Sequence, residues 1–84
     1  MDIVDTHQII MHNDNEHEFA YVMACLIRLC DHDPIQAEQC ALIAHHNGKC
    51  DIKHGSWEEM DDLSEQLLYL GLKVTVDEHK SHMY

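Results

Sequence analysis

Helix-boundary signals divide this chain into short pieces, and they constrain its fold more than any other feature. Asp33 stands directly before a proline, a pattern typical of a helix start because aspartate caps the first turn and proline is tolerated inside it. Ser56 and Glu59 have the spacing of a capping box, which marks a second start. Gly48 and Gly71 indicate helix ends, since glycine adopts the left-handed conformation that often closes a helix. The segments between these signals are long enough only for short helices, strands and turns.

Three pieces carry apolar residues at helical spacing, from about Glu16 to Cys30, from Pro34 to Asn47, and from Trp57 to Leu70. Asn15 is available to cap the first of these helices. The expected core-facing residues are Phe19, Val22, Cys25, Leu26 and Leu29 in the first helix, Ile35, Cys40, Ala41, Ile43 and Ala44 in the second, and Met60, Leu63, Leu67 and Leu70 in the third.

Three shorter apolar runs predict strands, at His7 to His12, Lys49 to His54 and Leu72 to Val76. The order is therefore β-α-α-β-α-β. Three strands cannot bury both faces of a sheet alone, so we expect a single α+β domain in which a three-stranded antiparallel sheet packs against three helices. Residues 1–8 are expected to hold a short N-terminal tail and the start of the first strand, residues 9–78 the core domain, and residues 79–84 a C-terminal tail, with the polar stretch beginning at Asp77.

The net charge of −11 excludes several classes of function. Nucleic acids and anionic membranes both require clustered lysine and arginine, which this chain does not have. An acidic surface favours a cationic partner group, or serves solubility alone. No run approaches the roughly 18 apolar residues of a membrane span, and the start of the chain lacks the pattern of a signal peptide, so the expected location is the cytoplasm.

The 4 cysteines and 9 histidines raise the question of a metal site or a thiol hydrolase. Their spacing favours neither, since no Cys-x-x-Cys pair occurs and Cys25 and Cys30 lie on the core-facing pattern of one helix. A nucleophilic thiol needs exposure and an adjacent base, whereas Cys25, Cys30 and Cys40 sit on apolar stripes. We therefore expect reduced, buried cysteines, no metal or other cofactor, and no enzymatic activity.

A polar cluster follows the first expected strand, at Asn13, Asp14 and Asn15. Taken alone, it is typical of a turn that also caps a helix. In a β-α-α arrangement, however, the end of the first strand and the end of the second helix can lie near each other. That arrangement would bring an amide, a carboxylate and the imidazole of His45 to one place.

These residues resemble the ClpS family of adaptor proteins, whose signature is an Asn-Asp-Asp turn after the first strand and a Val-His-x-x-Gly motif at the end of the second long helix. The corresponding residues here are Asn13-Asp14-Asn15 and Ala44-His45-His46-Asn47-Gly48. The resemblance runs without a gap from about Ile9 to Gly48, and the segment from Gly71 to Val76 is similar to the last strand of the family. Asn15 replaces the usual second aspartate, and Phe19 stands where the family usually has methionine.

The resemblance implies an adaptor that binds proteins beginning with Leu, Phe, Tyr or Trp and delivers them to a Clp-type AAA+ unfoldase, ClpA or ClpC, in the bacterial cytoplasm. By position, Asn13, Asp14 and His45 would bind the free α-amino group of the substrate. Glu58 matches a position on the side of the family that faces the unfoldase. The hydrophobic pocket would be lined by Asn15, Phe19, Val22, Ala41, Ala44 and Leu72.

Hydrogen-bonding chemistry is compatible with this assignment, because an α-ammonium group has three donors and Asn13, Asp14 and a neutral His45 can each supply an acceptor. One alternative stays open. A divergent α/β interaction domain of the same fold, which does not read N-termini, would have the same elements in the same order, and fold alone does not separate the two. A monomer is expected in either case.

Overall fold

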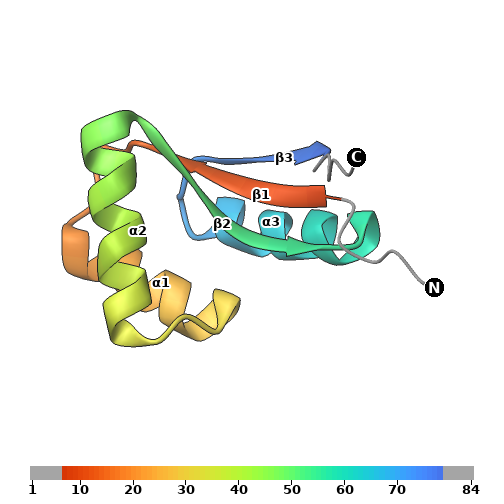
Figure 1. Ribbon diagram of the computed structural model, residues 1–84, viewed down its shortest axis with the longest axis horizontal. Coiled ribbons are helices and arrows are strands. Elements are labelled where there is room, and N and C mark those ends of the chain that lie inside the picture. The colour runs from red at the N-terminus through yellow and green to blue at the C-terminus, as the bar shows by residue number, and fades with distance from the viewer. Residues whose placement is uncertain (1–6, 79–84) are drawn as a thin grey trace, which may run out of the picture.

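The computed structural model describes residues 7–78, and these form three helices and three strands in the expected order (Figure 1). The elements are β1 (His7–His12), α1 (Phe19–Cys30), α2 (Pro34–Asn47), β2 (Lys49–Gly55), α3 (Trp57–Tyr69) and β3 (Val74–Glu78). The α+β class and the β-α-α-β-α-β order are confirmed. The tail expected at residues 79–84 lies outside the described residues.

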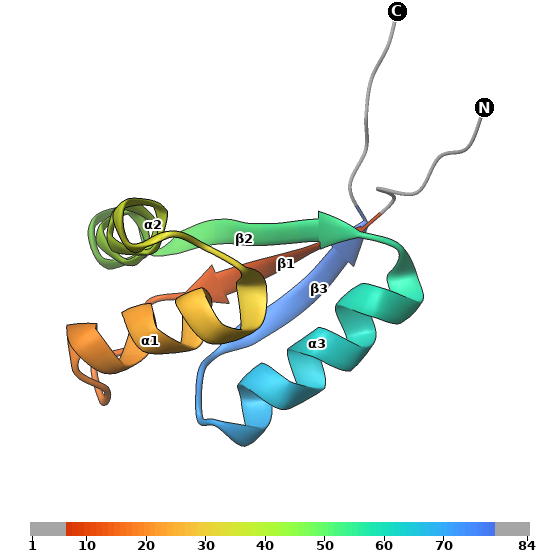
Figure 2. The same cartoon turned by 90° about the horizontal axis from the view of Figure 1, so that it is seen from below.

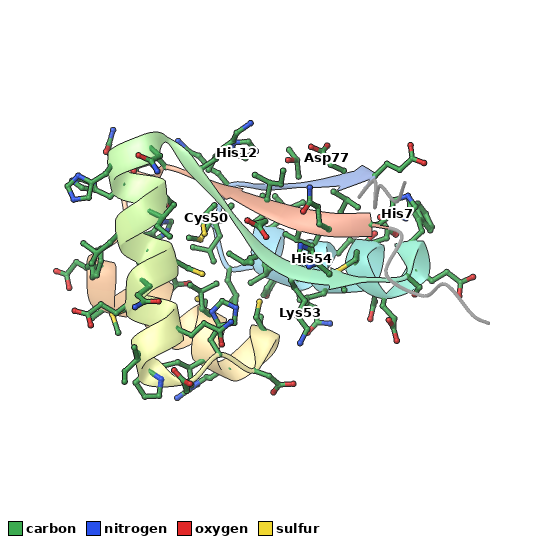
Figure 3. All side chains as sticks on the ribbon, viewed as in Figure 1. His7, His12, Cys50, Lys53, His54 and Asp77 are labelled. Carbon is green, nitrogen blue, oxygen red and sulfur yellow. The ribbon has the colours of Figure 1, made fainter. Side chains whose placement is uncertain are left out.

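β1 is the central strand of an antiparallel sheet with the order β2-β1-β3. Side chains alternate along a strand, so one face of the sheet is buried, with Ile9 and Met11 from β1 at its centre. His12 and Asp77 point away from the helices on the other face (Figure 3), where the Nε2 atom of His12 lies 2.9 Å from Oγ1 of Thr75. The sheet therefore has one apolar face and one polar, open face.

The helices occupy two positions relative to the sheet. α3 lies against its buried face and contacts all three strands, with α1 beside it. In Figure 2, α2 is seen end-on while the strands run across the view, so α2 lies crosswise at one end of the sheet, where it contacts α1 and β2. The largest fully buried side chains come from β1, α1 and α3, and are Ile9, Leu26, Cys30 and Leu67.

The start of α1 differs from the sequence prediction. The helix begins at Phe19 with Glu18 at the N-cap position and no side-chain cap, and Asn15 is exposed. The preceding residues form a turn instead, because Oδ1 of Asp14 accepts a hydrogen bond of 2.7 Å from the Glu16 backbone N–H. The predicted capping role of Asn15, and the predicted start near Glu16, are therefore wrong.

The starts of α2 and α3 follow their sequence signals. The Asp33 side chain accepts a 2.8 Å hydrogen bond from the Gln36 backbone N–H. Ser56 and Glu59 form both hydrogen bonds of a capping box. Gly48 closes α2 with a φ of 94°, in the left-handed region that the sequence prediction required.

Two further predictions need correction. In α2, Ile35 and Ile43 are 69% and 43% exposed, because a helix lying across the end of the sheet buries only one narrow face, which consists of Ala37, Cys40, Ala41 and Ala44. The third strand begins at Val74 rather than Leu72 and includes Asp77, since its pairing with β1 extends past the apolar run as far as Glu78.

The cysteines are buried and free, as the sequence predicted. Burial raises the pKa of Cys30 to about 11 and that of Cys50 to about 12. His32 is also buried, with its Nε2 atom 2.8 Å from the backbone oxygen of Ile52. Among residues 7–78, no helix is both long enough and apolar enough to cross a membrane.

Candidate binding pocket

A small pocket, with a free volume of about 40 Å³, opens at the end of the sheet next to α2. Four parts of the chain meet there: the end of β1 with the turn after it, the start of α1, the last turns of α2, and the residues leading into β3. The lining residues are Met11, His12, Asn13, Asp14, His17, Phe19, Val22, Ala41, Ala44, His45, Leu72 and Lys73.

Backbone hydrogen bonds hold these parts together. The His12 N–H donates to the Lys73 carbonyl at 2.8 Å, and the next N–H, that of Asn13, donates to the Gly48 carbonyl at 2.9 Å. The first bond attaches the end of β1 to the segment entering β3, and the second attaches it to the C-terminus of α2. Because His45 is in the last turn of α2, this second bond places Asn13 beside the turn that carries His45.

The inner wall of the pocket is apolar. Val22, Ala41, Ala44 and Leu72 are 8%, 5%, 3% and 2% exposed. Ala41 and Ala44 follow one another on the same face of α2, where their small side chains leave space rather than fill it. Phe19, at the first position of α1, is 39% exposed and stands where the pocket meets solvent. The pocket therefore offers apolar contact to a side chain that enters from outside.

Asp14 provides a negative charge at this pocket. Its side chain is 6% exposed, and its Oδ2 atom lies 2.5 Å from Nδ1 of His17, while Oδ1 accepts from the Glu16 N–H. Burial alone raises the pKa of Asp14, but these two hydrogen bonds, together with attraction to His17 and Lys73, lower it below the ordinary value of 3.8. Asp14 is therefore an ionised carboxylate at neutral pH.

His17 also lines the pocket, and its imidazole packs against an aromatic side chain of α1. The ring stacks on that of Tyr21 with a centroid distance of 4.9 Å and an interplanar angle of 15°. The hydroxyl of Tyr21 donates a 2.6 Å hydrogen bond to the carbonyl of Leu70, in the turn between α3 and β3. These contacts link the pocket to the α3–β3 turn.

The structure brings together eight residues that the sequence analysis named for the site. Asn13, Asp14 and His45 line the same pocket as Phe19, Val22, Ala41, Ala44 and Leu72. Asn15 is exposed and is not among the lining residues, and Glu58 is exposed in the first turn of α3, away from the pocket lining.

The sequence analysis missed four lining residues, Met11, His12, His17 and Lys73. Met11 was already part of an expected strand, and its alternation with Ile9 could have placed it on the inner face. The three-residue spacing from Asp14 to His17 was the available signal for a carboxylate–imidazole pair. Nothing in the local sequence pointed to Lys73.

The described part of the chain also bears on the question of a metal centre. Between residues 7 and 78, no group of three or more histidine, cysteine, aspartate or glutamate side chains is placed to hold a metal ion.

Comparison with known proteins identifies the family. The model of the family described as "ATP-dependent Clp protease adaptor protein ClpS" matches residues 3–75. Among solved structures, ClpS2 of Agrobacterium tumefaciens bound to L-phenylalaninamide superposes with a TM-score of 0.84, covering 89% of this chain and 98% of that chain. Its sequence identity is 14%, so this likeness shows a shared fold. The comparison with curated proteins gave no match. Since the family match spans most of the sequence, the chain belongs to the ClpS family of Clp protease adaptors, which are adaptors rather than catalysts.

Proposed function

We propose that this adaptor binds the free N-terminus of proteins that begin with a bulky hydrophobic residue, Leu, Phe, Tyr or Trp, and delivers them to a Clp AAA+ protease. The observation that carries the proposal is the composition of one pocket. An amide, a carboxylate and an imidazole, from Asn13, Asp14 and His45, line it together with buried apolar side chains. A hydrophobic N-terminal residue has the matching pair of groups, an ammonium and an apolar side chain, on the same α-carbon.

The polar residues suit an ammonium group. Its three N–H donors need three acceptors, which the Asn13 carbonyl, the Asp14 carboxylate and a neutral nitrogen of His45 can supply. Both oxygens of Asp14 already accept one hydrogen bond each within the protein. A carboxylate has about four acceptor positions, so acceptor capacity remains for the ligand. Asp14 also supplies a negative charge, which attracts the cationic ammonium group.

The apolar lining suits the side chain of the same residue. Burying a Leu or Phe side chain contributes about 1.5–3 kcal/mol, and each hydrogen bond to a charged group contributes about as much. After the loss of translational and rotational freedom, we expect a dissociation constant of about 1 μM. In the ClpS2 structure the bound ligand is L-phenylalaninamide, which has an aromatic side chain.

The direct test is a fluorescence-polarisation titration with a labelled peptide that begins with Phe, beside its N-acetylated twin. We expect the free peptide to bind and the acetylated one to lose at least about 100-fold in affinity, because acetylation removes the cation that would interact with the charge of Asp14. A Gly-initiated peptide should also bind weakly, since it fills no apolar space. Equal binding of all three peptides would favour an interaction domain that does not read N-termini.

We further propose that a ClpA- or ClpC-type unfoldase docks on the side of the molecule that carries Glu58. This glutamate is exposed in the first turn of α3, on a helix with acidic residues in that turn and no basic residue in its last turn. Glu58→Lys should weaken capture by an immobilised unfoldase N-terminal domain, whereas Glu38→Lys, exposed on α2, is the matched control. Equal capture of both variants would remove Glu58 from the interface.

We propose that this adaptor acts as a monomer in the bacterial cytoplasm. Size-exclusion chromatography with light scattering should give a mass near the 9.8 kDa of one chain. A mass of twice that value would indicate a dimer and contradict the proposed monomer.

A further inference from the structure

We propose that His17 is a positioning residue for this pocket: it holds the carboxylate of Asp14 in the orientation that receives the α-ammonium group of the ligand. The inference rests on the proposed function, and it extends that function to a residue outside the Asn-Asp and His motif positions.

The hydrogen bonds to Asp14 form a clamp on its carboxylate. Nδ1 of His17 lies 2.5 Å from Oδ2, and the Glu16 backbone N–H donates to Oδ1 at 2.7 Å. Each oxygen is therefore fixed by a separate donor, which leaves the carboxylate plane little freedom to rotate. A carboxylate that is already oriented loses less entropy when an ammonium group binds, and this difference appears as affinity.

The imidazole that makes this bond is itself held in place. Its ring stacks on Tyr21, and a Cβ atom built on Gly71 would lie 3.0 Å from both Cε1 and Nε2 of His17. The absence of a side chain at Gly71 is therefore what allows the ring to lie against the α3–β3 turn. Tyr21 is fixed in turn through its hydrogen bond to the Leu70 carbonyl. The position of Asp14 thus depends on contacts from both α1 and the α3–β3 turn.

The direction of the hydrogen bond follows from the charge of Asp14. An ionised carboxylate only accepts, so Nδ1 of His17 carries the proton that is donated. In its neutral form the imidazole can therefore orient Asp14 without adding a positive charge that would compete with the ligand.

Two substitutions separate the hydrogen bond from the packing. His17→Phe keeps an aromatic ring for the stack on Tyr21 and the contact with Gly71, but it has no donor. His17→Asn loses the ring, yet its side-chain N–H lies at about the same position along the side chain as Nδ1 and can donate. Thermal unfolding followed by circular dichroism verifies that both variants fold.

Affinity for the Phe-initiated peptide is the first measurement. We expect His17→Phe to weaken binding about tenfold, corresponding to the loss of one charge-assisted hydrogen bond, and His17→Asn to stay within about threefold of the unaltered protein. If His17→Phe binds as tightly as the unaltered protein, or His17→Asn as weakly as His17→Phe, the positioning role is overturned.

A second measurement needs no ligand. Carbon-13 NMR of the side-chain carboxyl follows the titration of Asp14, and loss of the His17 hydrogen bond in His17→Phe should move this titration to higher pH. His17→Asn should restore the part of the shift that comes from the hydrogen bond, but not the part that comes from the charge of His17. An unchanged Asp14 titration in His17→Phe would refute the clamp. If the unaltered protein instead fails to prefer the free over the acetylated peptide while the titration shifts as expected, the proposed function fails and the His17–Asp14 contact stands.

Discussion

Asp14 shows how a single side chain can serve both the local turn and the pocket. Its Oδ1 atom organises the turn before α1 by accepting from Glu16, while Oδ2 is the partner of His17. Enclosing a carboxylate in protein favours its neutral form, but the donors around it favour the charged form by more, so its pKa is lowered. The same contacts that shape the turn therefore keep the charge available.

This lowered pKa predicts how the stability of the protein depends on acid. Asp14 titrates near 3.8 in the unfolded chain and below that value in the folded one, so its charge stabilises the fold above 3.8 and this contribution is lost as pH falls through the folded value. Asp14→Asn should be less stable than the unaltered protein at neutral pH, with the difference closing below pH 3.8. Urea unfolding at a series of pH values measures it, and a difference independent of pH would contradict the prediction.

The exposed Asp62 on α3 provides a matched control for this experiment. Asp62→Asn removes the same charge from the molecule without touching the turn or His17. A pH-dependent difference as large as that of Asp14→Asn would attribute the effect to net charge rather than to the contacts of Asp14.

The helices and strands differ in how far the local sequence determines them. α2 and α3 begin where the sequence predicted, because Asp33 and Ser56 cap the backbone within their own first turns. The start of α1 and both ends of β3 were wrong, since Asp14 turns the chain before Phe19 and pairing with β1 defines the third strand. Boundaries made by contacts within a few residues were predictable, and boundaries made by distant partners were not.

The same distinction applies to the pocket. The residues at motif positions could be named from the sequence because the motifs are defined by residue type and by order along the chain. The spacing from Asp14 to His17 indicates a carboxylate–imidazole pair but not its place at the pocket, because that place depends on Tyr21 within α1 and on Gly71, more than fifty residues further on. The exposure of Ile35 and Ile43 was missed for a related reason, because periodicity identifies a helix but not how much of it a neighbouring element covers.

Two glycines offer a comparison at the scale of the elements, because both end a helical segment with nearly equal φ angles. Gly48 has a φ of 94° and Gly71 a φ of 92°, so alanine at either position should cost about 1 kcal/mol from backbone strain. A Cβ at Gly48 meets nothing within 4 Å, whereas one at Gly71 lies 3.0 Å from the ring of His17. Gly71→Ala should therefore be more destabilising than Gly48→Ala in urea unfolding.

A double variant isolates the steric part of that difference. In a His17→Ala background the clash is gone, so Gly71→Ala should then cost no more than Gly48→Ala does. If the excess cost of Gly71→Ala persists without the imidazole, the ring contact is not its source.

At the scale of the whole molecule, the pocket exists only when the complete fold exists. Its walls come from β1, α1, α2 and the segment entering β3, and the central strand joins them through the bonds of His12 and Asn13. No single helix or hairpin contains the site. A ligand that binds only the assembled pocket therefore stabilises the whole domain, by about 2.7 kcal/mol at 100 times its dissociation constant.

The buried thiols give a measure of that whole-molecule stability. Thiolates are the reactive form, and burial raises the pKa of all four cysteines above the ordinary 9.0, to about 11 for Cys30 and about 12 for Cys50. At about pH 8 the folded protein should therefore resist alkylation by iodoacetamide, both because the thiols are covered and because they stay protonated. Unfolding removes both protections together.

Mass spectrometry after timed exposure to iodoacetamide tests this expectation. We expect folded protein to remain unmodified over a period in which urea-unfolded protein acquires four labels, and the labelling rate to rise steeply through the urea transition. The raised pKa values also imply that stability falls as pH rises above 9.0, since unfolded thiols then lose protons that folded thiols keep. Saturating Phe-initiated peptide should slow labelling of all four cysteines equally, because the pocket and the core open in the same event. Rapid labelling of one cysteine without urea would show instead that its element opens separately from the rest of the domain.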